Sequence, residues 1–183
     1  MAAKDDKSEF DAFVKRQQQA AHEPIDWARE RNEWLEQLDE LYEMIKLFLK
    51  DYITSGAIDL RYQEVPLNEE NIGSYIARQM TIKIGPHEIT LKPIGTLLIG
   101  AKGRVDVVGP AGQTRFVLVN KDASRPRIIT TMIVNGRPND SATNEPSKSI
   151  VWAWKIATAP PRIEYIELTQ ESLYRALMEV VNG

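Results

Sequence analysis

The chain has 183 residues, of which 43% are hydrophobic and 27% charged, and its formal net charge at pH 7 is −3. These values are ordinary for a soluble globular protein of one domain, or of one domain with an appendage. The absence of cysteine excludes a disulfide framework and a cysteine-based zinc site, and it is consistent with a reducing cytosol. We see no apolar signal near residue 1 and no run of about 18 apolar residues, so we expect a cytoplasmic chain without a membrane span.

Charge is distributed unevenly along the chain. Residues 1–51 carry 8 Lys and Arg against 13 Asp and Glu, whereas residues 52–183 carry 15 against 13. An acidic part with helical patterning therefore precedes a slightly basic part that is rich in β-branched residues. The predicted segments are a polar leader at 1–23, a long amphipathic helix at 24–56, and an antiparallel β domain with a closing C-terminal helix at 57–183.

The leader contains Phe10, Phe13 and Val14 at helical spacing. This spacing predicts a short helix, but a mobile leader that orders only on contact fits the polar composition equally well.

The segment 24–56 predicts a helix with an apolar seam. Pro24 suits the first helical turn, Asp26 favours the N-terminal dipole, and Gly56 is a natural stop. After a first step of seven residues, the apolar positions recur at alternating intervals of four and three, which is typical of a coiled-coil seam. The seam comprises Trp27, Trp34, Leu38, Leu41, Ile45, Phe48 and Tyr52. A helix over 24–54 would be about 45 Å long.

This helix has two interpretations. Its wide apolar face covers the sheet, or part of it projects and packs on a second copy or another protein. The two are compatible, because Leu35, Tyr42 and Leu49 form a second stripe beside the seam. We take the seam as the candidate partner-binding site, because two Trp residues in it offer large anchors. The candidate residues are Trp27, Trp34, Leu38, Leu41, Ile45 and Phe48.

Two strand–turn–strand units lie within residues 79–120, and their registers follow from the sequence. Gly and Pro mark a turn at 85–86 and another at 109–112. One register in each unit places opposite charges on one face and apolar residues on the other, and a slip of one residue destroys both matches. The predicted pairs are Ile84–His87, Lys83–Glu88 and Ile82–Ile89 in the first unit, and Val108–Gln113, Asp106–Arg115 and Val105–Phe116 in the second. The predicted core face is Ile82, Ile84, Ile89, Leu91, Val105, Val107, Phe116 and Leu118.

The remaining elements are shorter. Residues 57–65 alternate like a half-buried strand that ends at Pro66, residues 67–79 are ambiguous between helix and strand, and glycines at 95, 100 and 103 indicate bulges or bends. Residues 135–149 form a loop, either disordered or functional. Strands follow at 150–157, with two Trp residues on one face, and at 162–168, before an amphipathic helix capped by Thr169. The fold class is therefore α+β: a strongly curved, mostly antiparallel sheet or open barrel of about eight strands, with helices from both chain ends packed against it.

Catalytic motifs are absent. We find no G-x-G-x-x-G, Walker, G-x-S-x-G or H-E-x-x-H pattern, and we expect no cofactor, no metal and no catalytic residues. His22 lies in the polar leader and His87 follows a turn without further ligands. An Asp on one strand and a carboxylate-x-Lys on the next would indicate a metal-dependent nuclease, but Val119 occupies the required carboxylate position between Asp106 and Lys121.

The stretch 100–137 is basic, with seven Lys and Arg against two Asp. A cluster of such residues at one end of the sheet would bind phosphates, whereas a solvated rim would only keep sheet edges from pairing. The overall pI of about 5.5 is low for a nucleic-acid-binding chain. The candidate nucleic-acid-binding residues are Lys121, Arg125, Arg127 and Arg137.

The sequence therefore favours a non-catalytic cytosolic interaction protein that binds a protein partner or itself through its N-terminal helix. A nucleic-acid-binding module that uses the stretch 100–137 is the first alternative. A small-molecule or enzymatic site inside the curved sheet is the second, because folding assembles such sites without a linear motif.

Overall fold

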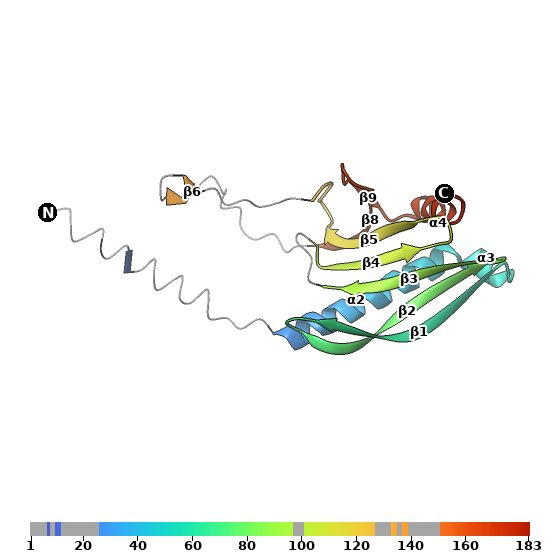
Figure 1. Ribbon diagram of the computed structural model, residues 1–183, viewed down its shortest axis with the longest axis horizontal. Helices are drawn as coiled ribbons and strands as arrows, with labels where there is room; N and C mark the ends of the chain where they lie inside the picture. The colour runs from blue at the N-terminus through green and yellow to red at the C-terminus, as the bar shows by residue number, and fades with distance from the viewer. Residues whose placement is uncertain are drawn as a thin grey trace.

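A seven-stranded antiparallel sheet forms the centre of the computed structural model (Figure 1). The structure describes residues 7, 10–11, 26–96, 101–126, 133–134, 137–138 and 151–183. The strand order is β1-β2-β3-β4-β5-β8-β9, so neighbours in the sheet follow one another along the chain, apart from a separate pair of two-residue strands. The strands of the sheet are β1 (Ile58–Glu69), β2 (Gly73–Ile84), β3 (His87–Gly95), β4 (Gly103–Val108), β5 (Gln113–Asn120), β8 (Trp152–Ala157) and β9 (Tyr165–Glu167). The separate pair is β6 (Ile133–Val134) and β7 (Arg137–Pro138).

The predicted α+β class is confirmed, but the barrel is not. The outermost strands are β1 and β9, which do not pair with each other, so the sheet is open and has seven strands rather than eight. The predicted strong curvature is likewise not confirmed. Most of the leader at 1–23 and most of the loop at 135–149 lie outside the described residues. No helix in the described ranges is both long enough and apolar enough to cross a membrane.

The N-terminal helix is shorter than predicted and is interrupted. Helix α2 spans Trp27–Phe48, and a single turn at Leu49 separates it from the short helix α3 at Lys50–Thr54. Asp26, predicted to lie inside the first helical turn, is instead the cap of α2 and accepts a hydrogen bond from the Arg29 N–H at 3.0 Å. At the interruption, the backbone carbonyl of Phe48 accepts side-chain hydrogen bonds from the C-terminal helix α4 (Gln170–Asn182). The helix is thus interrupted at the point where α4 contacts it.

Both predicted hairpin registers are confirmed. In the structure Lys83 lies opposite Glu88, and Asp106 lies opposite Arg115, with the apolar pairs on the other face. Seven of the eight predicted core residues are fully buried and Ile84 is half-buried. The salt bridges differ from the strand pairing, however: Glu88 pairs with Arg61 and Asp106 with Arg104.

The first hairpin, β1–β2, is a ribbon of two 12-residue strands. The strand β1 continues through Pro66, which an edge strand tolerates because one side of it has no partner strand to receive an N–H. Near the start of β1 the buried side chains are at even positions, and near its end at odd positions, so the ribbon twists. At its tip, the buried carboxylate of Glu69 accepts hydrogen bonds from Tyr75 and from the N–H and hydroxyl of Thr96. These bonds fasten the tip to the end of β3, where a register shift confirms the predicted bulge at Gly95.

The two long helices lie on the same face of the sheet. The α2 seam and the apolar face of α4 form one hydrophobic core with alternate residues of the strands. At its centre Trp34, Leu41 and Ile45 are fully buried. No described helix covers the opposite face along β1–β5, so this protein has one helical layer on one sheet.

Alkaline pH is expected to destabilise the protein through Tyr42. This side chain is 1% exposed and donates a hydrogen bond of 2.7 Å to the Arg78 carbonyl. Burial raises the pKa of Tyr42 above its ordinary value of about 10. A raised folded-state pKa gives stability that is present below pH 10 and is lost as the pH rises further, because the unfolded chain releases its proton first.

The measurement is the urea concentration at the midpoint of unfolding, determined at pH 8 and at pH 11. We expect the midpoint to fall in both the wild type and Tyr42→Phe, but to fall less in the variant, which has no phenol at this position to ionise. The variant should also be weaker at pH 8, by about 1 kcal/mol, because a hydrogen bond is lost. Equal falls in the two proteins would contradict this role for Tyr42.

Candidate binding groove

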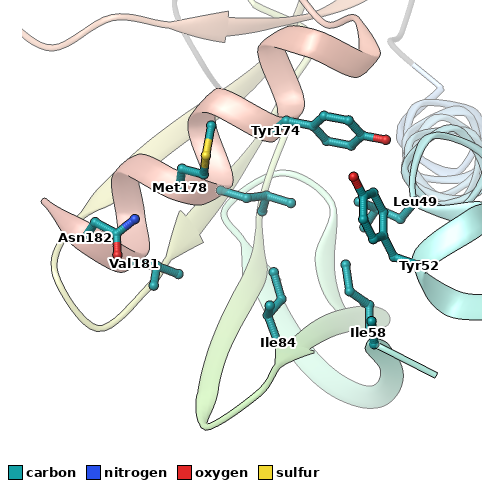
Figure 2. A pocket seen from close by; sticks show the side chains of 10 residues that line it. Leu49, Tyr52, Ile58, Ile84, Tyr174, Met178, Val181 and Asn182 are labelled. Atoms are coloured by element: carbon teal, nitrogen blue, oxygen red, sulfur yellow. The ribbon is translucent and has the colours of Figure 1, made fainter. Parts of the chain in front are cut away.

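An apolar groove of about 390 Å³ opens between α3 and α4. Its floor is made by Ile58 at the start of β1 and Ile84 at the end of β2, and Figure 2 shows Tyr52 and Tyr174 close together at the end of the groove away from Val181 and Asn182. The two rings form an edge-to-face contact with centroids 5.8 Å apart. The groove is lined by Leu49, Tyr52, Ala57, Ile58, Ile84, Tyr174, Leu177, Met178, Val181 and Asn182.

The walls of the groove are held in place by hydrogen bonds outside it. The Tyr174 hydroxyl donates to the Phe48 carbonyl at 2.8 Å, and Gln170 donates to the same carbonyl at 3.0 Å. At the other end of α4, the N–H of Ala111 donates to the Val180 carbonyl at 2.9 Å. A capping box formed by Thr169 and Ser172 fixes the first turn of α4. The groove therefore exists before anything binds in it, which lowers the entropic cost of binding.

The chemistry of the groove is that of apolar burial. Its lining contains no Asp, Glu, Lys, Arg or His, and Asn182 supplies the one side-chain amide. On the rim Tyr52 is 46% exposed and Met178 is 58% exposed. Tyr and Met are enriched at protein interfaces, and Met adapts its shape to different partners. Such a site binds apolar groups, and the hydroxyl of Tyr174 already donates to the Phe48 carbonyl.

The structure places the six candidate partner-binding residues mostly inside the chain. Four of them are at most 1% exposed and contact the sheet, so their apolar surface is already covered. Phe48 packs partly buried against the same core, and Trp27 is half-buried at the first turn of α2. The four buried residues are Trp34, Leu38, Leu41 and Ile45.

The candidate nucleic-acid-binding residues are not assembled into one site by the described structure. Lys121 is exposed, and Arg125 forms an ion pair with Glu164 at 3.1 Å, which offsets its charge. Arg127 lies outside the described residues, and only the backbone of Arg137, in β7, is placed.

The two Trp residues of β8 do not offer an exposed stacking platform. Trp154 is buried, and its indole N–H donates to the Gln37 carbonyl of α2 at 3.0 Å. Trp152 is half-buried and lies under the ammonium group of Lys102, 5.5 Å from its ring centre. Both indoles therefore join the sheet to neighbouring elements, as expected for a core stripe.

The remaining candidates for chemistry are also accounted for. His87 is exposed at the β2–β3 turn. Asp106 accepts two hydrogen bonds from the guanidinium of Arg104, at 2.6 and 2.7 Å. Within the described ranges, no three His, Asp or Glu side chains gather in a way that would hold a metal ion.

Sequence reasoning missed the groove, although it left a trace in α4. Beside the inward stripe of this helix, Tyr174, Met178 and Val181 recur at intervals of four and three. The apolar face of α4 is therefore wider than the sheet beneath it requires. The opposite wall and the floor come from residues at least 90 positions earlier, which no local pattern connects to α4.

Comparison of this chain with protein-family profiles, with curated proteins and with solved structures gave no match. Neither a related sequence nor a similar fold therefore assigns a function. The function has to be inferred from the geometry and chemistry of the surfaces that the structure describes.

Proposed function

We propose that the chain is a non-catalytic cytosolic interaction protein that receives an amphipathic helix of a protein partner in the groove between α3 and α4. The observation that carries this proposal is a gap in the helical layer. Ile58 and Ile84 lie on the face that α2 and α4 otherwise cover, yet they form the floor of an open groove. The N-terminal helical region takes part through Tyr52, the last residue of its apolar seam.

A helix is the occupant that suits this gap. Tyr52 of α3 and Tyr174 of α4 contact each other, so the groove has room for the side chains of a helix that lies over it, and not for the helix itself. Amphipathic helices bind such grooves by inserting apolar side chains spaced three and four residues apart. The volume of about 390 Å³ falls in the range of ordinary ligand sites, which start at about 300 Å³. A small apolar molecule of that size is the alternative occupant.

In the test, a library of random amphipathic helical peptides is screened for peptides that bind the full-length protein. Met178→Asp places a charge on the groove rim and is expected to weaken the selected peptides roughly tenfold to a hundredfold, because a buried Met contributes about 1.5–3 kcal/mol. Ile76→Asp is the matched control, since Ile76 is 54% exposed on β2 and does not line the groove. Affinities are measured by isothermal titration calorimetry.

Two outcomes would overturn the proposal. Peptides that bind both variants equally well would not occupy the groove. A library that yields no binder, together with binding of aliphatic alcohols that Met178→Asp abolishes, would assign the groove to a small apolar molecule instead.

A further inference from the structure

We infer that a second copy of this chain docks on the uncovered face of the sheet through the acidic outer face of its helix α2. The uncovered face consists of the side chains of β1–β4 and of the start of β5 that point away from the helices, and we call it the open face. Farther along β5, Val117 and Val119 are buried in a small apolar cluster with Ala157. The outer face of α2 carries Glu36, Glu40 and Glu43, all exposed, and we call it the acidic ridge. Glu43 also forms an exposed ion pair with Lys46 at 3.4 Å, which the contact with a second copy would replace. The inference does not depend on the groove or on its occupant.

The open face has more positive than negative charge. Its charged residues follow from the alternation of each strand and from the pairing registers. The cations are Arg61, Lys83, Lys92, Arg104 and Arg115, and the anions are Asp59, Glu88 and Asp106. The face therefore carries five positive charges against three negative ones.

All three carboxylates of the open face are bound by two of its arginines. Arg61 pairs with Asp59 at 3.0 Å and with Glu88 at 3.7 Å. Arg104 holds Asp106 with two hydrogen bonds. Consequently Lys83, Lys92 and Arg115 make no ion pair with any residue that the structure describes. Three cations on a rigid sheet without carboxylate partners favour an acidic surface.

The spacing of these cations matches the acidic ridge. Asp106 of β4 lies between Lys92 on the neighbouring strand β3 and Arg115 on the other neighbour, β5. Lys92 and Arg115 are therefore two strand spacings apart, or about 9.5 Å. Glu36 and Glu43 are seven residues apart on one helix face, or about 10.5 Å at 1.5 Å per residue. A helix α2 that crosses the strands at nearly a right angle therefore places one carboxylate near each cation.

An exposed leucine gives this contact a direction. Leu47 is 65% exposed on the outer face of α2, about 6 Å beyond Glu43. With Glu43 at Arg115, Leu47 lies over the next strand, β8, where Ala157 is opposite Arg115. Ala157 is itself buried in a small apolar cluster, and the half-buried Tyr165 of β9 is a member of that cluster that leaves apolar surface for Leu47. The opposite direction would place Leu47 over the polar β2 side of the face.

A nucleic acid is a poorer occupant of the open face. Proteins that bind single strands combine cations with aromatic rings on which the bases stack. Along β1–β5 the described side chains that point away from the helices include no Trp, Tyr or Phe. The second copy supplies carboxylates at the right spacing without needing such rings.

The geometry makes this association head-to-tail. The acidic ridge and the open face lie on opposite sides of the same chain, because α2 covers one face of the sheet and the open face is the other. Each copy therefore keeps one surface free after it docks, and dimers grow into larger assemblies as concentration rises.

The test is sedimentation velocity of the nuclease-treated, full-length protein at 50 and 500 mM NaCl. At low salt we expect an average mass above the monomer value of 20.8 kDa that increases with concentration. At high salt the dissociation constant should rise by roughly tenfold or more, because exposed charges are screened. Monomers at 50 mM salt and high protein concentration would overturn the inference, as would an assembly that disappears on nuclease treatment.

Charge reversal identifies the two surfaces. Lys92→Glu with Arg115→Glu makes the open face acidic, and Glu36→Lys with Glu43→Lys makes the ridge basic. Each double variant alone should be monomeric at 50 mM salt, because its two surfaces then repel. A mixture of the two should associate again, since each variant offers the surface that the other needs.

Matched controls separate this contact from overall charge and from the groove. Lys7→Glu with Arg175→Glu makes the same change in net charge as Lys92→Glu with Arg115→Glu, at exposed positions outside both surfaces, and it should leave association unchanged. Met178→Asp should also leave it unchanged. The inference is wrong if either control abolishes association, or if the mixture of reversed variants stays monomeric.

Discussion

Glutamate at both Leu38 and Ile45 is expected to unfold the protein. Both side chains are at most 1% exposed and lie in the core between α2 and the sheet. Each substitution removes buried apolar surface and leaves a carboxylate without a partner in the core, at a cost of several kcal/mol. Together the two costs are comparable to the whole stability of a typical domain, about 5–15 kcal/mol. Far-UV circular dichroism should show loss of the sheet signal, and thermal unfolding should show no cooperative transition.

This experiment decides between the two interpretations of the α2 seam. If the seam served a partner, the double variant would lose association and keep its sheet. Leu47→Glu is the control for adding a charge to α2, because Leu47 lies on the outer face and is 65% exposed. It should change the free energy of unfolding by about 0.5 kcal/mol or less. A double variant that folds cooperatively would contradict the packing of α2 on the sheet. The apolar seam of α2 would then be better explained as a partner-binding site.

The hairpin registers were predictable because they depend on neighbours in sequence. A turn of two to four residues brings Lys83 opposite Glu88 and Val105 opposite Phe116, and alternation then fixes every other pair. The same locality made the cap of α4 visible at Thr169, whereas Asp26 was expected inside the first helical turn and is instead the cap of α2. These features need only the chain within about ten residues.

The β1–β2 tip was not predictable for the opposite reason. Asn68 and Gly73 made residues 67–79 ambiguous, and Pro66 indicated the end of a strand. The strand continues because its tip is held by Glu69, which binds Thr96 from 27 positions away. A buried carboxylate is acceptable there only because three donors converge on it, and sequence alone does not show that convergence.

The candidate surfaces were only partly visible for the same reason. A net positive charge in the stretch 100–137 could be counted from the sequence, but the cations that lack a carboxylate partner could not be identified. The pairing register suggested that Asp106 serves Arg115, whereas its carboxylate binds Arg104 on the same strand. The groove joins residues near 50, 84 and 178, so its existence depends on how α4 sits against α3.

Alanine at Gly103 is expected to destabilise the protein strongly. A Cβ atom there would lie 2.2 Å from Cζ3 and 2.5 Å from Cε3 of Trp34, well inside contact distance. The indole cannot move away cheaply, because Trp34 is fully buried between α2 and the sheet. Overpacking of this kind costs about 1–3 kcal/mol. For a chain of this size, each 1 kcal/mol lowers the melting temperature by about 2–4 °C.

Two further variants show whether the cost comes from this contact. Gly112→Ala is the control, because a Cβ at Gly112 meets nothing within 4 Å, and its melting temperature should stay within about 2 °C of the wild type. Trp34→Phe removes part of the ring system that the methyl group added by Gly103→Ala would strike. It should therefore cost stability in the wild type but less, or nothing, when Gly103→Ala is present, with a coupling energy of about 0.5–3 kcal/mol in the double-mutant cycle. Additive costs would mean that Trp34 does not rest on β4. The apolar seam of α2 would then pack on a different part of the sheet. The groove, which lies beyond the C-terminal end of α2, would have a different position as well.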